Sequence, residues 1–453
     1  MRLQKVQSDS SHGGNCKHLY RTEVNICVYP SRLSGHVSAP PSKSVMQRLI
    51  AGALLAKGTS HLHNISQSDD CTSALLLASQ LGAEIELGET DVRITGTGGN
   101  IIPRSTILTP GESGLAARLF TPIAGLGTVS VSVEAENSLQ GRPMEEFESI
   151  FHQLGGILKT TGGSFPVSIE RPLQGGTTTL NGQISSQFTT GLLFALPCAK
   201  LNSELTVLEP VSLPYVDLTL QVIEDFGIEM IANNERTQFA CKGSQSFSPI
   251  DAVVDGDWSG AAVLAVAGML CAESSIELSG LNNQYMQADE AIRGAMLFAG
   301  GALSGTEEGI QVAKRPVRPF NVDLTESPDL FPALAALAAF GKKPSRLKGV
   351  HRLEHKESHR AQTIQSEWAK LGIRVEHDHT SDELVVYPRE RDFSPAMAIN
   401  PHGDHRIAMA ASIIGLAGDH PVIVKDAECV AKSYPEFFDD LAVLGANVSL
   451  KPS

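Results

Sequence analysis

Apolar and polar residues follow one another along this chain in a pattern that predicts short helices, each ending at a glycine before an extended stretch. The pattern occurs six times, with glycines at positions 82, 155, 227, 300, 372 and 445. Successive glycines are 73, 72, 73, 72 and 73 residues apart, a register that chance does not keep over five intervals. Each glycine predicts the left-handed residue that ends a helix, and a hairpin is predicted after most copies. The sequence therefore predicts six repeated α/β units, three in each of two domains.

The sixth unit is incomplete, because only eight residues follow Gly445 in a chain of 453. Two N-terminal stretches, 24–29 and 35–37, are strand candidates that have no other unit to join. We expect them to dock beside the C-terminal unit, so that one domain is built from both chain ends. The predicted division is a flexible tail at 1–22, an inner domain at 41–255, and an outer domain at 23–40 plus 256–453.

The first predicted helix of the inner domain begins after Pro40 and Pro41 and extends to Leu55. Its apolar residues at positions 46, 49, 50, 53 and 54 have the spacing of a half-buried helix. Lys43 falls in its first turn, and Ser44, Gln47 and Arg48 share one face. A helix N-terminus with two cations and a hydroxyl suits a phosphate or carboxylate. A capped surface helix with solvated charges explains the same residues equally well.

Other polar groups stand at predicted helix starts or beside glycines. Taken one at a time, each is better explained as a helix cap or a surface charge than as a ligand. No partner spacing around His405 supports a zinc site or a catalytic triad. These further candidates are Gly111–Gly114 with Arg118, Arg142, Ser185, Ser186, Gln187, Ser212, Asp329, Lys356, Glu357, Arg360, Asp404, Arg406 and Lys432.

Composition narrows the classes of function. Hydrophobic residues make up 42% and charged residues 19% of the chain, which is typical of a globular protein large enough for two domains. The net charge of −14 argues against nucleic acid or an anionic membrane as partner, although small anions remain possible ligands of a local cationic cleft. The seven cysteines are scattered without a C-x-x-C pair, which predicts reduced thiols and no zinc site. The first twenty residues lack an apolar run, so we expect no secretory signal and a cytoplasmic protein.

The candidate segments follow one another in the order that one family shows. Over residues 24–450 the sequence resembles the enolpyruvyl transferases, and among them the EPSP synthases. The resemblance rests on motifs spread over most of the chain: Pro-x-Lys-Ser-x-x-x-Arg at 41–48, Ser68-Asp69-Asp70, Gly111-x-x-Gly114-x-x-x-Arg118, Arg142-Pro143-Met144, Ser185-Ser186-Gln187, Gly256-Asp257, Pro328-Asp329, Lys356-Glu357-x-x-Arg360, Asp404-His405-Arg406 and Lys432.

The resemblance implies an α/β (α+β) fold, namely a two-domain inside-out α/β barrel of six repeated units. It implies an alkyl-group transferase that moves the carboxyvinyl group of phosphoenolpyruvate to the 5-hydroxyl of shikimate 3-phosphate and releases phosphate. No cofactor and no metal are implied, and a monomer is expected. Asp329 is the implied base, and Glu357 or Lys43 the implied acid. The implied ligands of phosphoenolpyruvate are Lys43, Gly114, Arg142, Arg360, Arg406 and Lys432, and those of shikimate 3-phosphate are Ser44, Arg48, Ser185, Ser186, Gln187, Ser212 and Lys356.

Three positions depart from the family pattern. Glu112 stands where asparagine is usual, Leu115 replaces a threonine, and Arg352 replaces an asparagine that often helps to bind the shikimate phosphate. We expect activity to survive and the affinity for glyphosate, the family's inhibitor at the phosphoenolpyruvate site, to differ. Two alternatives stay open: UDP-N-acetylglucosamine 1-carboxyvinyltransferase, which usually has a loop cysteine that this chain lacks between Cys71 and Cys198, and a non-catalytic anion-binding homologue.

Overall fold

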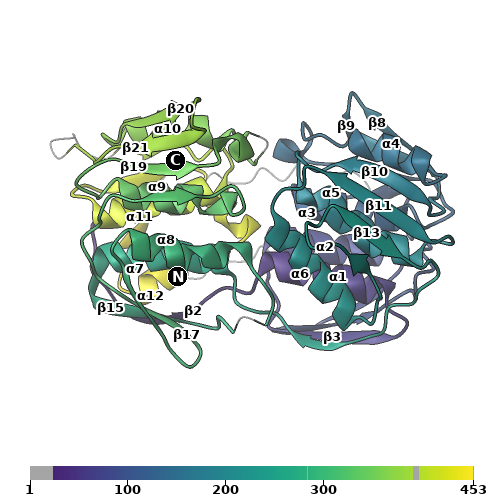
Figure 1. Ribbon diagram of the computed structural model, residues 1–453. Coiled ribbons are helices and arrows are strands. Elements are labelled where there is room, and N and C mark those ends of the chain that lie inside the picture. The colour runs from purple at the N-terminus through teal and green to yellow at the C-terminus, as the bar shows by residue number, and fades with distance from the viewer. Residues whose placement is uncertain (1–23, 283, 355, 391–396, 452–453) are drawn as a thin grey trace.

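The structure is a computed structural model, and it describes residues 24–451 except positions 283, 355 and 391–396. The predicted tail at 1–22 lies outside the described residues. Two lobes stand side by side, and the chain passes from one to the other (Figure 1). The inner lobe has a hydrophobic core of side chains between Val45 and Val254, joined by Tyr285. The outer lobe has a second core, built from residues 26–39 and 258–446. We propose that these cores correspond to the predicted domains.

The described strands form six four-stranded sheets, three in each lobe, with one common order of neighbours. In each sheet an edge strand pairs in parallel with the second strand, and the third and fourth strands pair antiparallel. The sheets of the inner lobe are β14 (Asp251–Val253), β3 (Thr59–His63), β5 (Asp91–Thr95), β4 (Glu84–Leu87); β6 (Ile107–Leu108), β7 (Val131–Val133), β9 (Ser164–Arg171), β8 (Ile157–Thr161); and β10 (Thr177–Asn181), β11 (Ser203–Leu208), β13 (Gln238–Cys241), β12 (Ile231–Ala232).

The sheets of the outer lobe repeat that order with strands from both chain ends. They are β2 (Leu33–Ser38), β15 (Ala272–Ser279), β17 (Gly309–Ala313), β16 (Ala302–Gly305); β18 (Asn321–Asp323), β19 (Ser345–Lys348), β21 (Glu383–Val386), β20 (Val375–Asp378); and β22 (Ala398–Ile399), β23 (Val422–Val424), β1 (Asn25–Val28), β24 (Val448–Lys451). The expected docking of the N-terminal strands beside the C-terminal unit is confirmed for β1, which pairs with β23 and β24. It is wrong for β2, which pairs with β15 and completes the sheet of another unit of the outer lobe.

In the described part of the chain, each lobe encloses three almost wholly buried α-helices and carries three partly exposed ones. The buried helices are rich in alanine, leucine and glycine, which lets them pack closely at the centre of a lobe. They are α1 (Lys43–Leu55), α3 (Gly114–Ala124), α5 (Ser186–Ala195), α7 (Trp258–Cys271), α9 (Phe331–Ala338) and α11 (His405–Ala417). The others are α2 (Asp69–Gln80), α4 (Glu146–Gln153), α6 (Leu213–Asp225), α8 (Ile292–Phe298), α10 (Arg360–Ala369) and α12 (Phe437–Val443).

The six repeated glycines end the partly exposed helices as predicted. All six have positive φ, from 70° at Gly372 to 115° at Gly82. The N–H after each glycine donates to a carbonyl five residues earlier, as Ala83 does to Ala78 at 3.0 Å. This is the Schellman arrangement, which closes the helix and aims the chain into the next strand. It explains why the glycine register could be seen in the sequence.

Two chain crossings join the lobes and lie beside each other. The first leaves β2 and enters α1, and the second leaves β14 and enters α7. Ser42 N donates to Asp255 O at 2.7 Å, and Asp257 N donates to Pro40 O at 2.6 Å. The crossings therefore form a short two-stranded connection directly before the start of α1. In the part of the chain that is described, no helix has the length and apolar character that a bilayer crossing requires.

The first helix differs from its prediction in one respect. It begins at Lys43 and ends at Leu55, and Ser42 caps it by accepting a hydrogen bond from Val45 N at 3.5 Å. Every residue from Val45 to Leu55 is buried, including Gln47 and Arg48. The half-buried surface helix expected from the apolar spacing is wrong, because α2, α3 and α6 all pack around α1. A charged face buried in this way must find partners inside the protein.

Candidate active site

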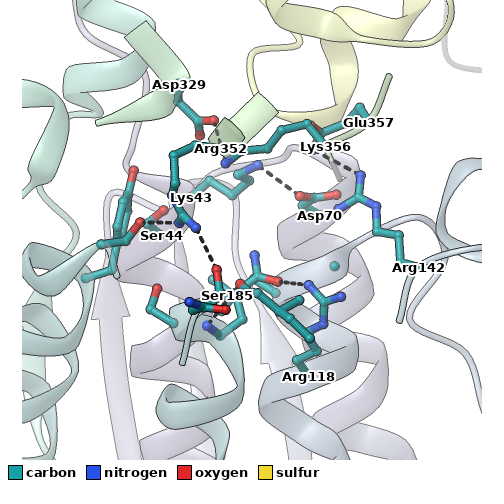
Figure 2. A pocket seen from close by; sticks show the side chains of 18 of the residues that line it. Lys43, Ser44, Asp70, Arg118, Arg142, Ser185, Asp329, Arg352, Lys356 and Glu357 are labelled. Atoms are coloured by element: carbon teal, nitrogen blue, oxygen red, sulfur yellow. Dashed lines mark hydrogen bonds and ion pairs between the residues drawn. The ribbon is translucent and has the colours of Figure 1, made fainter. Parts of the chain in front are cut away.

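A cleft of about 1080 Å³ lies between the lobes, with polar walls from both of them (Figure 2). The inner lobe supplies the first residues of its three buried helices, and the outer lobe supplies loops that precede its helices. The cleft is lined by Lys43, Ser44, Arg48, Asp70, Gly114, Leu115, Arg118, Arg142, Gln183, Ile184, Ser185, Ser186, Gln187, Ser212, Tyr215, Asp329, His351, Arg352, Lys356 and Glu357.

Lys43 enters the cleft from the first turn of α1. Its Nζ donates to Asp70 Oδ2 at 3.0 Å, and Asp70 lies in the first turn of α2. Burial lowers the pKa of Lys43, but the charge of Asp70, helped by Glu357 and Asp329, raises it above its ordinary value overall. Lys43 is therefore a cation at neutral pH, and among the described residues the carboxylate that holds it at the cleft is that of Asp70.

Arg48 is buried in the wall of the cleft, and its donors are occupied by protein groups. Its guanidinium donates to the Ser44 carbonyl at 2.8 Å, to Thr219 Oγ1 at 3.0 Å and to the Tyr215 carbonyl at 3.2 Å. Burial lowers the pKa of Arg48 to about 10, which still leaves it charged at neutral pH. Arg48 thus ties the start of α1 to α6, and it fixes the backbone that presents Ser44.

A second group of inner-lobe residues surrounds the start of α5. Ser185 caps this helix by accepting from Gln187 N at 3.2 Å. Arg118, on α3, donates to Gln187 Oε1 at 2.9 Å and to the Pro143 carbonyl at 2.8 Å. Arg118 therefore orients Gln187 and also fixes the segment that carries Arg142. Ser185 caps the helix and also lines the cleft, so a role as helix cap does not exclude a role in binding a ligand.

Arg142 has hydrogen-bonding capacity that the described protein does not use. Its Nε and Nη2 are buried, and neither has a hydrogen-bond partner among the described residues. The nearest carboxylate is Glu357, with Nη2 3.6 Å from Oε1 across the cleft. A buried guanidinium without partners is costly, so an anionic ligand at this point would be bound strongly. Gly114 allows the approach, because a Cβ there would lie 2.6 Å from Arg142 Nη1.

Asp329 is the centre of the outer-lobe wall. It lies in a short 3-10 turn, η4 (Pro328–Leu330), and faces three cations. Its carboxylate accepts from Lys356 Nζ at 3.2 Å, from Arg360 Nη1 at 2.6 Å, and lies 3.0 Å from Arg406 Nη2. Burial raises the pKa of Asp329, but these three cations outweigh it and hold the pKa well below its ordinary value. The side chain is therefore ionised and electrostatically stabilised at neutral pH.

Glu357 forms the neighbouring part of that wall. Arg360 Nη2 donates to Glu357 Oε2 at 2.7 Å, and Arg360 Nε donates to Asp404 Oδ2 at 2.7 Å. Burial raises the pKa of Glu357, but Arg360, Arg142 and the other nearby cations hold it well below its ordinary value. Taken alone, Lys356, Glu357 and Arg360 were better explained as charges of a surface helix, one turn apart. That explanation is wrong, because α10 begins only at Arg360 and Arg360 is fully buried.

Two of the residues that depart from the family pattern contact the opposite lobe. Arg352, from the 3-10 turn η5 (Val350–Leu353), donates to Ser212 Oγ at 2.8 Å and to the Gln183 carbonyl at 3.1 Å. Glu112 accepts from Asn137 and Ser138 in its own lobe at 2.9 and 3.0 Å. Its Oε2 also lies 3.8 Å from Lys432 Nζ of the outer lobe. The carboxylate of Glu112 is therefore paired rather than free.

The structure brings the predicted residues together from both lobes. Twelve of them line the cleft, whereas Arg360, Arg406 and Lys432 lie directly behind it, in contact with Asp329, Glu357 or Glu112. Five further lining residues were not among the candidates. Asp70 lies within one of the family motifs, which was a usable signal, but no motif marked the other four. These are Gln183, Ile184, Tyr215 and His351.

A profile of the family described as EPSP synthase (3-phosphoshikimate 1-carboxyvinyltransferase) matches residues 28–441. The chain belongs to the EPSP synthase family. A 3-phosphoshikimate 1-carboxyvinyltransferase of Clostridium beijerinckii is 33% identical over 429 residues, which cover 93% of this chain and 97% of that relative. One of Aeropyrum pernix is 34% identical over 431 residues, covering 94% and 97%. A solved EPSP synthase structure from Acinetobacter baumannii has a TM-score of 0.78 and 25% identity, covering 95% of this chain and 100% of that one.

Membership of the EPSP synthase family confirms the family and the fold class that the sequence motifs predicted. The chain is therefore an alkyl-group transferase of the shikimate pathway. The same matches favour EPSP synthase over the alternative, UDP-N-acetylglucosamine 1-carboxyvinyltransferase. The domain limits and the roles of individual residues stay predictions.

Proposed function

We propose that this protein transfers the carboxyvinyl group of phosphoenolpyruvate to the 5-hydroxyl of shikimate 3-phosphate by addition and elimination. In the addition, the 5-oxygen bonds to C2 of phosphoenolpyruvate while a proton is delivered to the methylene carbon. In the elimination, phosphate leaves and a proton is lost from the new methyl group, which restores the double bond. The observation that carries this proposal is the pair of ionised carboxylates, Asp329 and Glu357, facing cations of both lobes across one cleft.

Phosphoenolpyruvate is proposed to lie between Arg142 and the outer-lobe cations. Arg142 Nε and Nη2, Arg406 Nε and Lys432 Nζ are buried and lack hydrogen-bond partners among the described residues. A phosphate and a carboxylate would satisfy such donors, and guanidinium groups suit both geometrically. Lys43 and Arg360 complete the set, and the backbone at Gly114 lies beside Arg142. The cationic groups would offset the repulsion between two anionic substrates.

Shikimate 3-phosphate is proposed to bind the hydroxyl and amide groups of the inner lobe together with Lys356. Ser44, Ser185, Ser186, Gln187 and Ser212 stand at helix starts, where backbone N–H groups also favour a phosphate. Arg48 belongs to this set, but its occupied donors favour a positioning role, in which it holds Ser44 for the ligand. Arg352, already bonded to Ser212, would add a cation for the phosphate.

Asp329 is the proposed base for the 5-hydroxyl proton. Its lowered pKa makes it a weak base when Lys356, Arg360 and Arg406 all face it. Substrate anions would share those cations, so the pKa of Asp329 should rise when both substrates are bound. The base is then strongest in the complex that needs it. Glu357 or Lys43 is the proposed acid for the methylene carbon, and both face the same cleft. Lys43 already carries a proton, whereas Glu357 must first take one up, which bound substrate anions would favour by raising its pKa.

The protein is proposed to act as a cytoplasmic monomer on these two small molecules, without nucleic acid or membrane as partner. Unpaired cysteines support a reducing compartment, since the six described ones are all free. The non-catalytic alternative predicts loss of the acid, base or cation set. Against it, Lys43, Asp329 and Glu357 are all present at the cleft, and Arg142, Arg360 and Arg406 contact the two carboxylates.

Phosphate release from purified protein tests the proposal. Release should require both phosphoenolpyruvate and shikimate 3-phosphate, and it should collapse in Asp329→Ala and Lys43→Ala. Lys159→Ala is a matched control, because Lys159 is an exposed lysine that pairs with Glu170 away from the cleft. Thermal stabilisation by shikimate 3-phosphate without any release would support the binding homologue instead. Release with UDP-N-acetylglucosamine in place of shikimate 3-phosphate would contradict the proposal.

A further inference from the structure

A cluster of two histidines and two aspartates lies on the inner lobe, and none of its members lines the cleft. His61 and His63 alternate on β3 with Ser60 and Leu62, which are buried, so both imidazoles point away from the core. Asp251 on β14 is paired with His61, and Asp91 on β5 is paired with His63. Three neighbouring strands therefore present these four side chains on one face of one sheet; we name them the β3 cluster.

The histidines are oriented toward Asp251. His63 Nε2 lies 3.1 Å from Asp251 Oδ1, and His61 Nδ1 lies 3.7 Å from Asp251 Oδ2. One ligand atom from each of these three residues fits within 4.8 Å of the others. Two atoms bonded to the same tetrahedral ion at 2.0–2.2 Å are about 3.4 Å apart. The observed separations bracket that value, so an ion between the three side chains needs little rearrangement of them.

Asp91 holds the other nitrogen of His61. Asp91 Oδ2 lies 2.6 Å from His61 Nε2, which leaves Nδ1 to face Asp251. A carboxylate on the second ring nitrogen fixes the orientation and the tautomer of a metal-ligating histidine. The four residues thus divide into three ligands and one orienting group. Simple ion pairing of surface histidines does not require such a division.

We propose that the β3 cluster binds one divalent transition-metal ion, of the class of Zn²⁺ or Ni²⁺, through His61 Nδ1, His63 Nε2 and the Asp251 carboxylate. Imidazole and carboxylate ligands suit these borderline ions, whereas Mg²⁺ prefers oxygen ligands alone. The Asp251 side chain is 73% exposed, so water has access to complete the coordination. The expectation of no metal came from the cysteine spacing, the surroundings of His405 and the family resemblance, none of which concerns the β3 cluster.

A bound ion would stabilise the pairing of the short edge strand β14 with β3. β14 has three residues, and among the described strands it pairs with β3 alone, at the edge of its sheet. It leads straight into the second crossing, where Val254 N donates to the His63 carbonyl at 2.9 Å and Asn64 Nδ2 donates to the Val254 carbonyl at 2.7 Å. A metal that links β3 to β14 would therefore stabilise the point where the chain leaves the inner lobe. Its expected role is structural.

A second pair of neighbouring histidines, in the outer lobe, allows a comparison with the β3 cluster. His377 and His379 have the same spacing as His61 and His63, and their rings are equally close, with centroids 3.8 Å apart against 3.9 Å. No third ligand atom gathers around that second pair in the part of the chain that is described. Two adjacent histidines alone bind a metal less well than three convergent ligands. The geometry therefore predicts one site rather than two.

Isothermal titration of Zn²⁺ and of Ni²⁺ into chelator-treated full-length protein tests the proposal. We expect one strong site per chain, no comparable site for Mg²⁺, and a higher Tm with saturating Zn²⁺. His63→Ala and the nearly isosteric Asp251→Asn should each weaken binding at least tenfold. Asp91→Asn should weaken it about 10- to 100-fold by freeing His61, and His379→Ala should leave it unchanged.

Two results would overturn the proposal. One is equal affinity in the wild type, His63→Ala and Asp251→Asn, which would place any bound Zn²⁺ on other groups such as cysteines. The other is loss of the strong site in His379→Ala. Because Asp251→Asn keeps the size of the side chain on an exposed strand, a folded variant is expected, and its circular dichroism should match that of the wild type.

Discussion

Arg360 Nη1 donates a hydrogen bond to Asp329 Oδ1 over 2.6 Å, from a guanidinium that is itself fully buried. Arg360 also bonds Glu357 and Asp404, so one residue orients both proposed catalytic carboxylates. The arrangement keeps Asp329 ionised before substrate arrives and sets how strongly a bound anion can change its basicity.

Asp329→Asn should lower kcat by about 100- to 10,000-fold, the usual range for loss of a general base. The KM values should change far less, because asparagine keeps the shape and the hydrogen bond from Lys356. Steady-state phosphate release measures both constants. Asp323→Asn is the matched control, since Asp323 is an exposed aspartate of β18 that pairs with Lys348. A kcat for Asp329→Asn within threefold of that control would contradict the base assignment.

The stability of the protein should fall steeply in acid. Asp329 and Glu357 have folded-state pKa values below their ordinary values of 3.8 and 4.5, because the surrounding cations outweigh the opposing effect of burial. Groups with lowered folded pKa stabilise the fold fully above their unfolded pKa, and that contribution is lost as pH falls through the folded pKa. Urea unfolding measured from pH 6 downward should show a shallower acid loss in the Asp329→Asn, Glu357→Gln double variant. An unchanged slope would show that these carboxylates carry little of the effect.

Glu112→Asn should strengthen phosphoenolpyruvate binding. Glu112 lies 3.8 Å from Lys432, one of the proposed ligands, and its charge competes with the substrate for that cation. Removing the charge should lower the KM for phosphoenolpyruvate by roughly threefold to tenfold, about 0.7–1.4 kcal/mol. The inhibition constant of glyphosate should fall in the same variant, because the inhibitor occupies the same site. Glu136→Gln is a suitable control nearby, because it also removes one negative charge. Equal KM values for phosphoenolpyruvate and equal inhibition constants in both variants would show that Glu112 does not influence the site.

Much of the fold could be predicted from the sequence, because six glycines recur at a nearly constant spacing. A Schellman turn needs a left-handed residue at a fixed place, so Gly82 and its five counterparts mark the end of a helix in every unit. The place of β1 followed from the missing half of the sixth unit, whereas that of β2, which completes the sheet of another unit, did not. The burial of α1 could not be predicted from its apolar spacing, because that spacing does not show whether neighbouring helices also cover the polar face.

The candidate site was accessible only through motifs spread over the chain. Their residues meet because the two crossings bring helix starts of one lobe against loops of the other, and no local pattern encodes that contact. Tyr215 and Gln183 were missed for this reason. The β3 cluster shows the same limit, since His61-x-His63 is visible in the sequence but Asp251 joins it only through strand pairing almost 200 positions away.

Gly114→Ala should weaken phosphoenolpyruvate binding without destabilising the fold. A Cβ at this position would lie 2.6 Å from Arg142 Nη1, and the flexible end of Arg142 is what must move. Alanine is otherwise favourable at the first turn of α3, so the free energy of unfolding should change by less than about 1 kcal/mol. The displaced guanidinium should raise the KM for phosphoenolpyruvate several-fold and leave that for shikimate 3-phosphate nearly unchanged. Gly141→Ala, where a Cβ meets nothing within 4 Å, is the control, and equal KM values in both variants would show that Arg142 does not bind this substrate.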